Sequence, residues 1–126
     1  MTLSANEHNT GSRSSLQAAQ TSIRQGDIEL AFQFLLKSTF EALKAVAAAR
    51  GLKLRSDASI WDFGEALASD WRNQGVFSSA FPVARFAFLD SFGGYSFTFE
   101  ELQAYHEYIA AGVKELQTMA AAEISR

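Results

Sequence analysis

The sequence contains no cysteine, one proline and two histidines among its 126 residues. Without cysteine the chain cannot form disulfides, thiolate metal sites or a cysteine nucleophile, and this composition suits the cytoplasm, where we expect the protein to act. With so little proline, long helices can run without a break. His106 has no second histidine near it in the sequence, and one imidazole cannot make a zinc site, so we expect neither metal nor cofactor.

Long apolar runs are also absent. No stretch approaches the roughly 20 apolar residues that a bilayer-spanning helix requires, so we expect no membrane association. The first residues, MTLSANEHNTGSRSS, lack the basic start and the apolar middle of a signal peptide. They are mostly polar and low in bulk, and we therefore expect residues 1–13 to form a flexible lead-in to a single domain over residues 14–126.

The charge balance gives no strong positive field. The net charge is −3, which predicts weak nucleic-acid binding or none. One basic cluster is present, and its position favours a solvated helix end over a phosphate-binding patch, because cations complement the dipole at a helix C-terminus. The cluster consists of Lys44, Arg50, Lys53 and Arg55.

Apolar residues recur at helical spacing, and no segment alternates apolar and polar residues as a half-buried strand does. We therefore predict a single all-α, up-and-down bundle of about five helices, with the two long helices packed antiparallel. We expect the first helix to start at Ser14/Ser15 and to stop near Gly26, and the second to be capped by Asp27 and to stop at Gly51. The third helix should begin with a Ser59–Asp62 capping box, and the fifth with a Thr98–Glu101 capping box. The fourth helix should be capped by Ser79, with Pro82 in its first turn, and should stop at Gly93–Gly94.

The expected fourth helix leaves almost no polar face. Its residues 84–95 read ARFAFLDSFGGY, with an arginine among phenylalanines. A helix that is apolar all round is buried on all sides, and a bundle this small rarely surrounds one helix completely. We expect a second copy of the chain to cover it, with Phe81, Phe88 and Phe92 in the interface. The alternative is that the N-terminal segment or the first helix lies across it.

Two long segments resemble the archaeal PaREP family, which belongs to the HEPN-like group of helical-bundle proteins. The first is RQGDIELAFQFLLKSTFEALKAVAAARGL, residues 24–52, and the second is VFSSAFPVARFAFLDSFGGYSFTFEEL, residues 76–102. The resemblance covers about residues 15–117 and implies a HEPN-like bundle. It also implies a possible nucleotidyltransferase-type partner. Ribonucleases of the HEPN group carry an arginine followed four to six residues later by a histidine, at a cleft between two subunits.

In this chain Arg85 matches the arginine of that motif, but Asp90 stands where the histidine would be, and Phe86 replaces a polar residue. An imidazole can donate or accept a proton near neutral pH, whereas a carboxylate at its usual pKa only accepts hydrogen bonds. We therefore expect a non-catalytic or weakly catalytic dimeric binding or accessory module. The alternatives are a divergent HEPN-type ribonuclease that uses Arg85, and a helical adaptor that binds a peptide.

Arg85 and Asp90 are separated by about 140° around a helix, which is unsuitable for a pair within one helix. Across a two-fold axis, Arg85 of one chain can meet Asp90 of the other, so we expect a reciprocal pair in the dimer interface. The alternative is an arginine whose methylenes cover the phenylalanines while its guanidinium reaches solvent or a carboxylate.

Overall fold

The computed structural model describes residues 4–70, 72, 75–92 and 97–125, with the backbone alone described for residues 90–92. Within these residues the regular structure is helical and includes no strand, which confirms the all-α prediction. The five helices are α1 (Ala5–Arg24), α2 (Ile28–Ala49), α3 (Asp57–Ser69), α4 (Val76–Phe92) and α5 (Phe99–Ile124).

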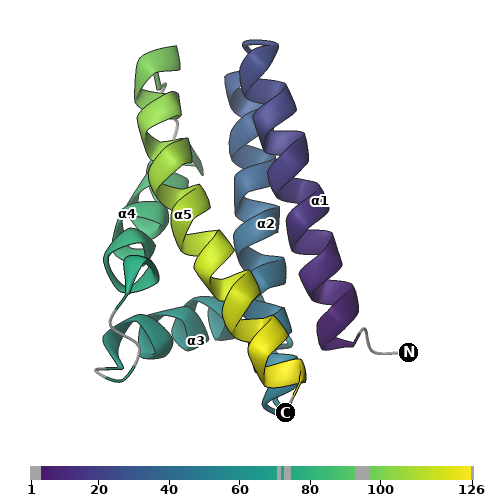
Figure 1. The fold of residues 1–126 in the computed structure, drawn as a ribbon. Helices are drawn as coiled ribbons and strands as arrows, with labels where there is room; N and C mark the ends of the chain where they lie inside the picture. Colours follow the sequence, from purple (N-terminus) through teal and green to yellow (C-terminus); the bar gives the residue numbers. More distant parts are fainter. Residues whose placement is uncertain (1–3, 71, 73–74, 93–96, 126) are drawn as a thin grey trace.

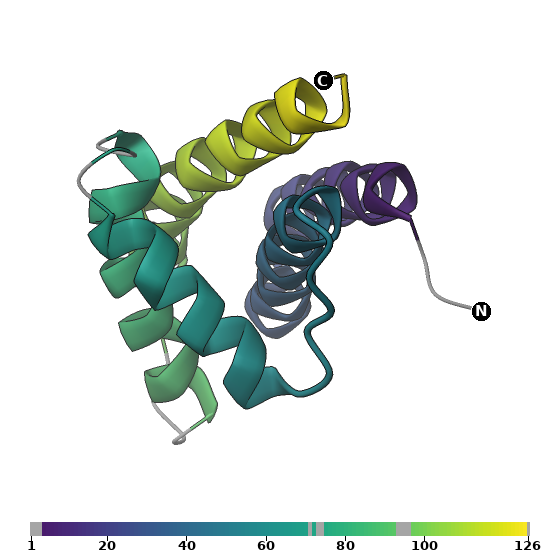
Figure 2. The same cartoon turned by 90° about the horizontal axis from the view of Figure 1, so that it is seen from below.

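The helices form a bundle in which neighbours along the chain are mostly antiparallel. α1 and α2 make a hairpin with the most extensive contact in the molecule, and α5 packs against both (Figure 1). α3 lies across the lower end of the bundle, and α4 returns beside α5 (Figures 1 and 2). The crosswise α3 is therefore the one departure from a simple up-and-down order among the described helices.

α1 begins well before the predicted start at Ser14/Ser15, so a flexible segment over residues 1–13 is wrong for the described part of that range. Ser4 and Glu7 form a capping box: the Ser4 hydroxyl accepts from the Glu7 amide at 3.2 Å, and the Glu7 carboxylate accepts from the Ser4 amide at 3.3 Å. These bonds satisfy amide hydrogens that a helix start leaves free.

The buried face of this early part of α1 is polar, which explains why apolar periodicity did not reveal it. The Ser12 hydroxyl donates to the Ser38 carbonyl at 2.9 Å, and the Ser38 hydroxyl donates back to the Ser12 carbonyl at 2.7 Å. Gln117 Nε2 of α5 donates to Ser12 Oγ at 2.9 Å, and Asn9 Nδ2 donates to the Gln117 carbonyl at 3.2 Å. A polar seam thus joins α1, α2 and α5 inside the bundle.

Four of the predicted helix ends are confirmed. Asp27 caps α2 by accepting from the Leu30 amide at 3.1 Å, and Gly51, with φ of 77°, follows its C-cap. Thr98 and Glu101 form the predicted capping box at the start of α5, with bonds of 3.1 and 3.0 Å. Gly26, with φ of 75°, follows the end of α1 as predicted.

Two further predicted starts are wrong. Ser59 is not the N-cap of α3, because Ser56 caps that helix and Ser59 occupies the third position of its capping box. Ser79 is not the cap of α4, because the helix already begins at Val76 and the Ser79 hydroxyl donates to the Val76 carbonyl at 3.1 Å. Pro82 consequently lies inside α4, beyond its first turn. The predicted Gly93–Gly94 stop lies outside the described residues.

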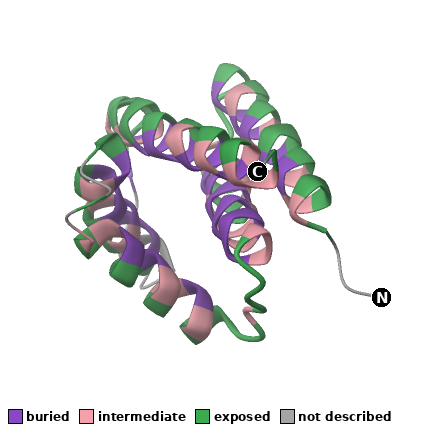
Figure 3. Cartoon of the chain, turned by 60° about the horizontal axis from the view of Figure 1, so that its bottom comes forward, coloured by how far each residue is buried: buried purple, intermediate pink, exposed green. Residues whose placement is uncertain are grey.

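One hydrophobic core fills the bundle. α2 directs its apolar face inward, with Leu35 and Leu43 fully buried. α5 contributes Leu102, Ile109, Val113 and Leu116, which are all buried. Figure 3 shows the same inward arrangement of buried residues on every helix. The core is lined with small residues between α2 and its neighbours, where Ala31, Ala42, Ala45, Val46 and Ala47 are fully buried.

Candidate functional site

The outward face of α4 carries the most exposed large apolar side chains in the described part of the chain. Phe86 is 61% exposed and Leu89 is 58% exposed, and they follow the exposed Pro82 at helical spacing. We refer to Pro82, Phe86 and Leu89 as the α4 stripe. The opposite face of α4 faces the core. Its buried residues, which recur at three- and four-residue intervals, are Phe77, Phe81, Ala84, Ala87 and Phe88.

The prediction that Phe81 and Phe88 belong to an interface is wrong. They are only 3% and 1% exposed, and both rings pack against Trp61 of α3, with centroid distances of 5.7 and 6.2 Å. The core of the chain itself therefore covers them, and one face of α4 is left for solvent or a partner. The side chains of Phe92 and Asp90 lie outside the described residues, so their predicted roles stay predictions.

Arg85 sits at the border between the two faces of α4. Its Nη1 donates to Glu65 Oε2 of α3 at 2.9 Å, with side chains that are 44% and 62% exposed. An exposed pair of this kind contributes about 0–1 kcal/mol. The arrangement matches the alternative in which the guanidinium extends beyond the phenylalanine side chains and binds a carboxylate. Both groups remain accessible, so either can change partners when another molecule approaches.

A second candidate site is a cleft between α1 and α5. It has a volume of about 280 Å³ and is lined by Gln20, Ile23, Arg24, Gln103, His106 and Glu107. His106 is half-buried, and its Nε2 atom is buried without a hydrogen-bond partner among the residues that the structure describes. Burial lowers the pKa of His106 below its ordinary 6.5, with smaller opposing and reinforcing effects from Glu107 and Lys114. Nothing in the sequence around His106 indicates that it lies beside α1.

His8 does not lie in a flexible segment, because it belongs to α1. Its Nδ1 is 2.6 Å from Glu41 Oε2 of α2, and only 13% of the His8 side chain is exposed. Lys44 lies 3.6 Å from the other oxygen of the same carboxylate. A carboxylate that binds one ring nitrogen fixes the orientation of the imidazole. This contact joins α1 to α2 and could not be seen in the sequence, where the two residues are far apart.

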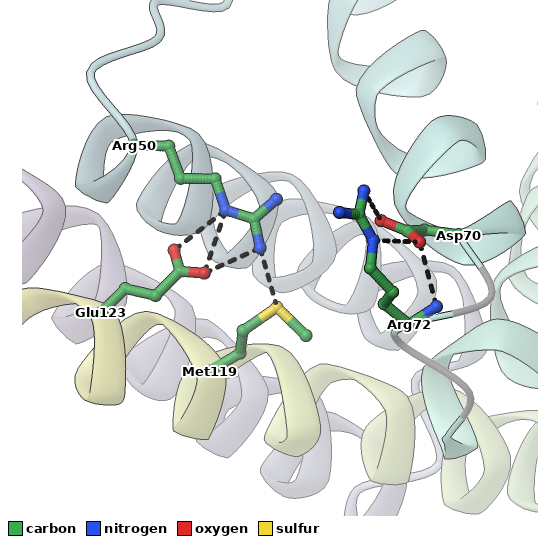
Figure 4. Close-up of polar contacts among 5 residues, drawn as sticks. All are labelled: Arg50, Asp70, Arg72, Met119 and Glu123. Carbon is green, nitrogen blue, oxygen red and sulfur yellow. Dashed lines mark hydrogen bonds and ion pairs between the residues drawn. The ribbon is translucent and has the colours of Figure 1, made fainter.

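Part of the predicted basic cluster is neutralised. Arg50 donates from Nε and Nη2 to the Glu123 carboxylate, with a shortest distance of 2.7 Å, and also approaches Met119 (Figure 4). These bonds tie the C-terminal ends of α2 and α5 together. Nearby, hydrogen bonds from Arg72 hold the pKa of Asp70 below its ordinary value, and the positive charge of Arg50 acts in the same direction.

The described residues offer no group of three or more potential metal ligands. Among the same residues, none of the helices combines the length and apolar character that a bilayer span requires. Comparison with known proteins found no matching family model, no matching curated protein and no matching solved structure.

Proposed function

We propose that the protein is a HEPN-like binding or accessory module that works as a homodimer joined through the outward face of α4. The observation that carries the proposal is the exposure of Phe86 and Leu89, at 61% and 58%, on adjacent turns of one helix. Water-exposed side chains of this size gain free energy when a partner covers them, at about 25 cal/mol per Å² of apolar surface. Resemblance to the HEPN-like group supports the dimer and the bundle.

Charge at the edge of the α4 stripe suits a second copy of the same chain. Arg85 of α4 and Glu65 of α3 both lie beside the stripe and are both accessible. In a two-fold dimer the same surface faces itself, so a cation on one chain can approach a carboxylate of the other. The partner carboxylate is Glu65 or, as the sequence predicts, Asp90. In both cases a Phe-containing interface is bordered by compensated charges.

The resemblance extends this proposal in two directions. It implies a nucleotidyltransferase-type protein as a further partner in the cytoplasm, and it leaves a divergent ribonuclease that uses Arg85 as the second reading. A ribonuclease needs a group that donates or accepts protons beside the arginine. Glu65 is the one side chain of the described residues that bonds to Arg85. A glutamate can itself accept a proton, so the preference for the binding module rests on the exposed α4 stripe and not on this pair.

Sedimentation equilibrium tests the dimer. We expect the unaltered protein to dimerise, and Phe86→Asp with Leu89→Asp to sediment as a monomer, because buried carboxylates in an apolar interface are costly. Leu52→Asp is the matched control, since Leu52 is 49% exposed but lies in the segment after α2. A monomeric parent protein, or a dimer that survives both aspartates, would contradict the proposal.

Charge exchange identifies the carboxylate that meets Arg85. Arg85→Asp should weaken the dimer, and adding either Asp90→Arg or Glu65→Arg should restore much of it. Recovery with Asp90→Arg alone supports the reciprocal pair with Asp90, and recovery with Glu65→Arg alone supports Glu65. If Arg85→Asp remains fully dimeric, Arg85 takes no part in the interface. Loss of RNA cleavage in Arg85→Asp, with dimerisation unchanged, would instead favour the ribonuclease.

A further inference from the structure

The cleft between α1 and α5 results from the way these helices separate along their length. They are held together by the bonds from Asn9 to the Gln117 carbonyl, at 3.2 Å, and from Gln117 to Ser12, at 2.9 Å. Toward the C-terminal end of α1 and the N-terminal end of α5 the two helices diverge (Figure 1). The resulting cleft of about 280 Å³ is close to the lower limit of typical small-molecule sites, roughly 300 Å³.

The cleft presents one charge of each sign on opposite walls. Arg24 comes from the last turn of α1, and Glu107 comes from α5. Within the described residues neither side chain belongs to an ion pair of 4.0 Å or less, in contrast to Arg50 and Arg85. Gln20 and Gln103 add amide groups that both donate and accept hydrogen bonds, and Ile23 provides an apolar contact.

His106 adds an unsatisfied polar atom to the same wall. Its Nε2 is buried and has no hydrogen-bond partner within the described part of the chain, which costs free energy. The imidazole is neutral at pH 7, because burial lowers its pKa, so it adds no net charge. Arg24 and Gln103 are exposed and Gln20 is half-buried, so these long side chains can rearrange when a molecule enters.

We propose that this cleft binds a small zwitterion of the free α-amino acid class. Arg24 binds the carboxylate through its guanidinium, Glu107 binds the ammonium, and the ligand side chain lies against Ile23. A simple anion meets repulsion from Glu107, and a simple cation meets repulsion from Arg24. A zwitterion matches both charges and leaves the glutamine amides to bind its remaining polar atoms. The site lies on α1 and α5, and it does not depend on a dimer built on α4.

Nuclear magnetic resonance tests the proposal on the full chain. The twenty common L-amino acids are added one at a time while the ring proton signals of His106 are followed. We expect at least one of them to give a saturable shift at millimolar concentrations. The amine and the acid that correspond to that amino acid each lack one charged group. Each should bind at least about tenfold more weakly than the amino acid.

Variants locate the two charge contacts. Arg24→Gln and Glu107→Gln should each weaken binding by about tenfold or more, whereas Arg13→Gln, an exposed residue of α1 outside the cleft, should leave it unchanged. Monomeric Phe86→Asp/Leu89→Asp protein should bind as the parent does, which separates this site from the proposed dimer. The proposal is overturned if no amino acid gives a saturable shift up to about 10 mM, or if Arg24→Gln binds as tightly as Arg13→Gln.

Discussion

At the scale of single residues, Glu115 completes the start of α4 from another helix. Its carboxylate accepts from the Val76 amide at 2.8 Å and from the Phe77 amide at 3.4 Å. An added Cβ at Gly75 would lie 2.3 Å from Glu115 Oε1, so the glycine leaves room for the carboxylate. α4 thus obtains its N-terminal acceptor from α5, and a negative charge at this position also matches the helix dipole.

Replacing this carboxylate should loosen α4. We predict that Glu115→Ala lowers the free energy of unfolding by about 1–2 kcal/mol, because the first amides of the helix lose their acceptor. Urea unfolding followed by circular dichroism measures the change. Glu107→Ala, which removes an exposed carboxylate from the same helix, is the control and should change stability by less than about 0.5 kcal/mol. Equal losses in the two variants would show that Glu115 is not a cap.

His106 gives the protein a pH-dependent contribution to stability. Burial lowers its pKa below 6.5 in the folded state, so the unfolded chain takes up a proton first as the pH falls. The free energy of unfolding should therefore decrease as pH drops below about 6.5, and this contribution levels off below the folded-state pKa. Urea unfolding between about pH 8 and pH 5 should show a steeper decline for the parent protein than for His106→Gln. Parallel profiles would exclude a perturbed His106.

At the scale of helices, glycine sets how closely α3 approaches its neighbours. A Cβ at Gly64 would lie 2.6 Å from Phe81 Cζ and 3.2 Å from Leu43 Cδ1. The Phe81 ring is only 3% exposed and packs against Trp61 and Phe77, so it cannot move aside cheaply. Gly112 has a similar role between α5 and α4, where an added Cβ would meet the Ala80 Cβ at 2.9 Å.

Two glycine substitutions should therefore differ in their effect on the free energy of unfolding. Gly64→Ala should destabilise the protein by about 1–3 kcal/mol, because the overpacking of a core outweighs the gain in helix propensity. Gly11→Ala, also within a helix, should be neutral or stabilise by up to about 1 kcal/mol. Its added Cβ would lie no closer than 3.4 Å to Glu41, which is ordinary contact. Thermal unfolding compares the two, and a stabilised Gly64→Ala variant would show that α3 can move away from α4.

At the scale of the whole molecule, charge decides which partners are favoured. The net charge is −3, and within the basic cluster Lys44 approaches Glu41 and Arg50 is bound to Glu123. The cluster therefore presents fewer unpaired cations to a phosphate backbone than its residue types alone indicate. Nucleic-acid binding needs several free cations, because its affinity comes mainly from phosphate contacts and the counterions that they release.

We predict that a fluorescein-labelled single-stranded RNA binds more weakly than about 1 μM at physiological salt, and that its affinity falls steeply as salt is added. Fluorescence anisotropy measures both quantities. The comparison variant is Glu123→Gln, which frees Arg50 and should strengthen binding modestly. Submicromolar binding that persists at high salt would count against the accessory module and in favour of a nucleic-acid function.

The sequence by itself determined the features that depend on neighbours along the chain. The apolar faces of α2 and α5 follow from three-to-four spacing, which places Leu35, Leu43 and Ile109 on one side of a helix. The ends at Asp27 and Thr98 follow from hydrogen bonds that span three residues. These signals are local, so they can be read without knowing how the helices pack.

The tertiary structure alone decided the contacts between residues far apart in the sequence. The Ser12–Ser38–Gln117 seam buries a polar helix face that carries no apolar period. The Glu115 carboxylate accepts a hydrogen bond from the first amide of α4, a helix that precedes it in the chain. The partner of Arg85 is Glu65 on another helix, and the cleft at His106 exists because α1 and α5 diverge. Hydrogen bonds and charges between distant residues leave no periodic pattern, since each depends on how two packed helices are placed in space.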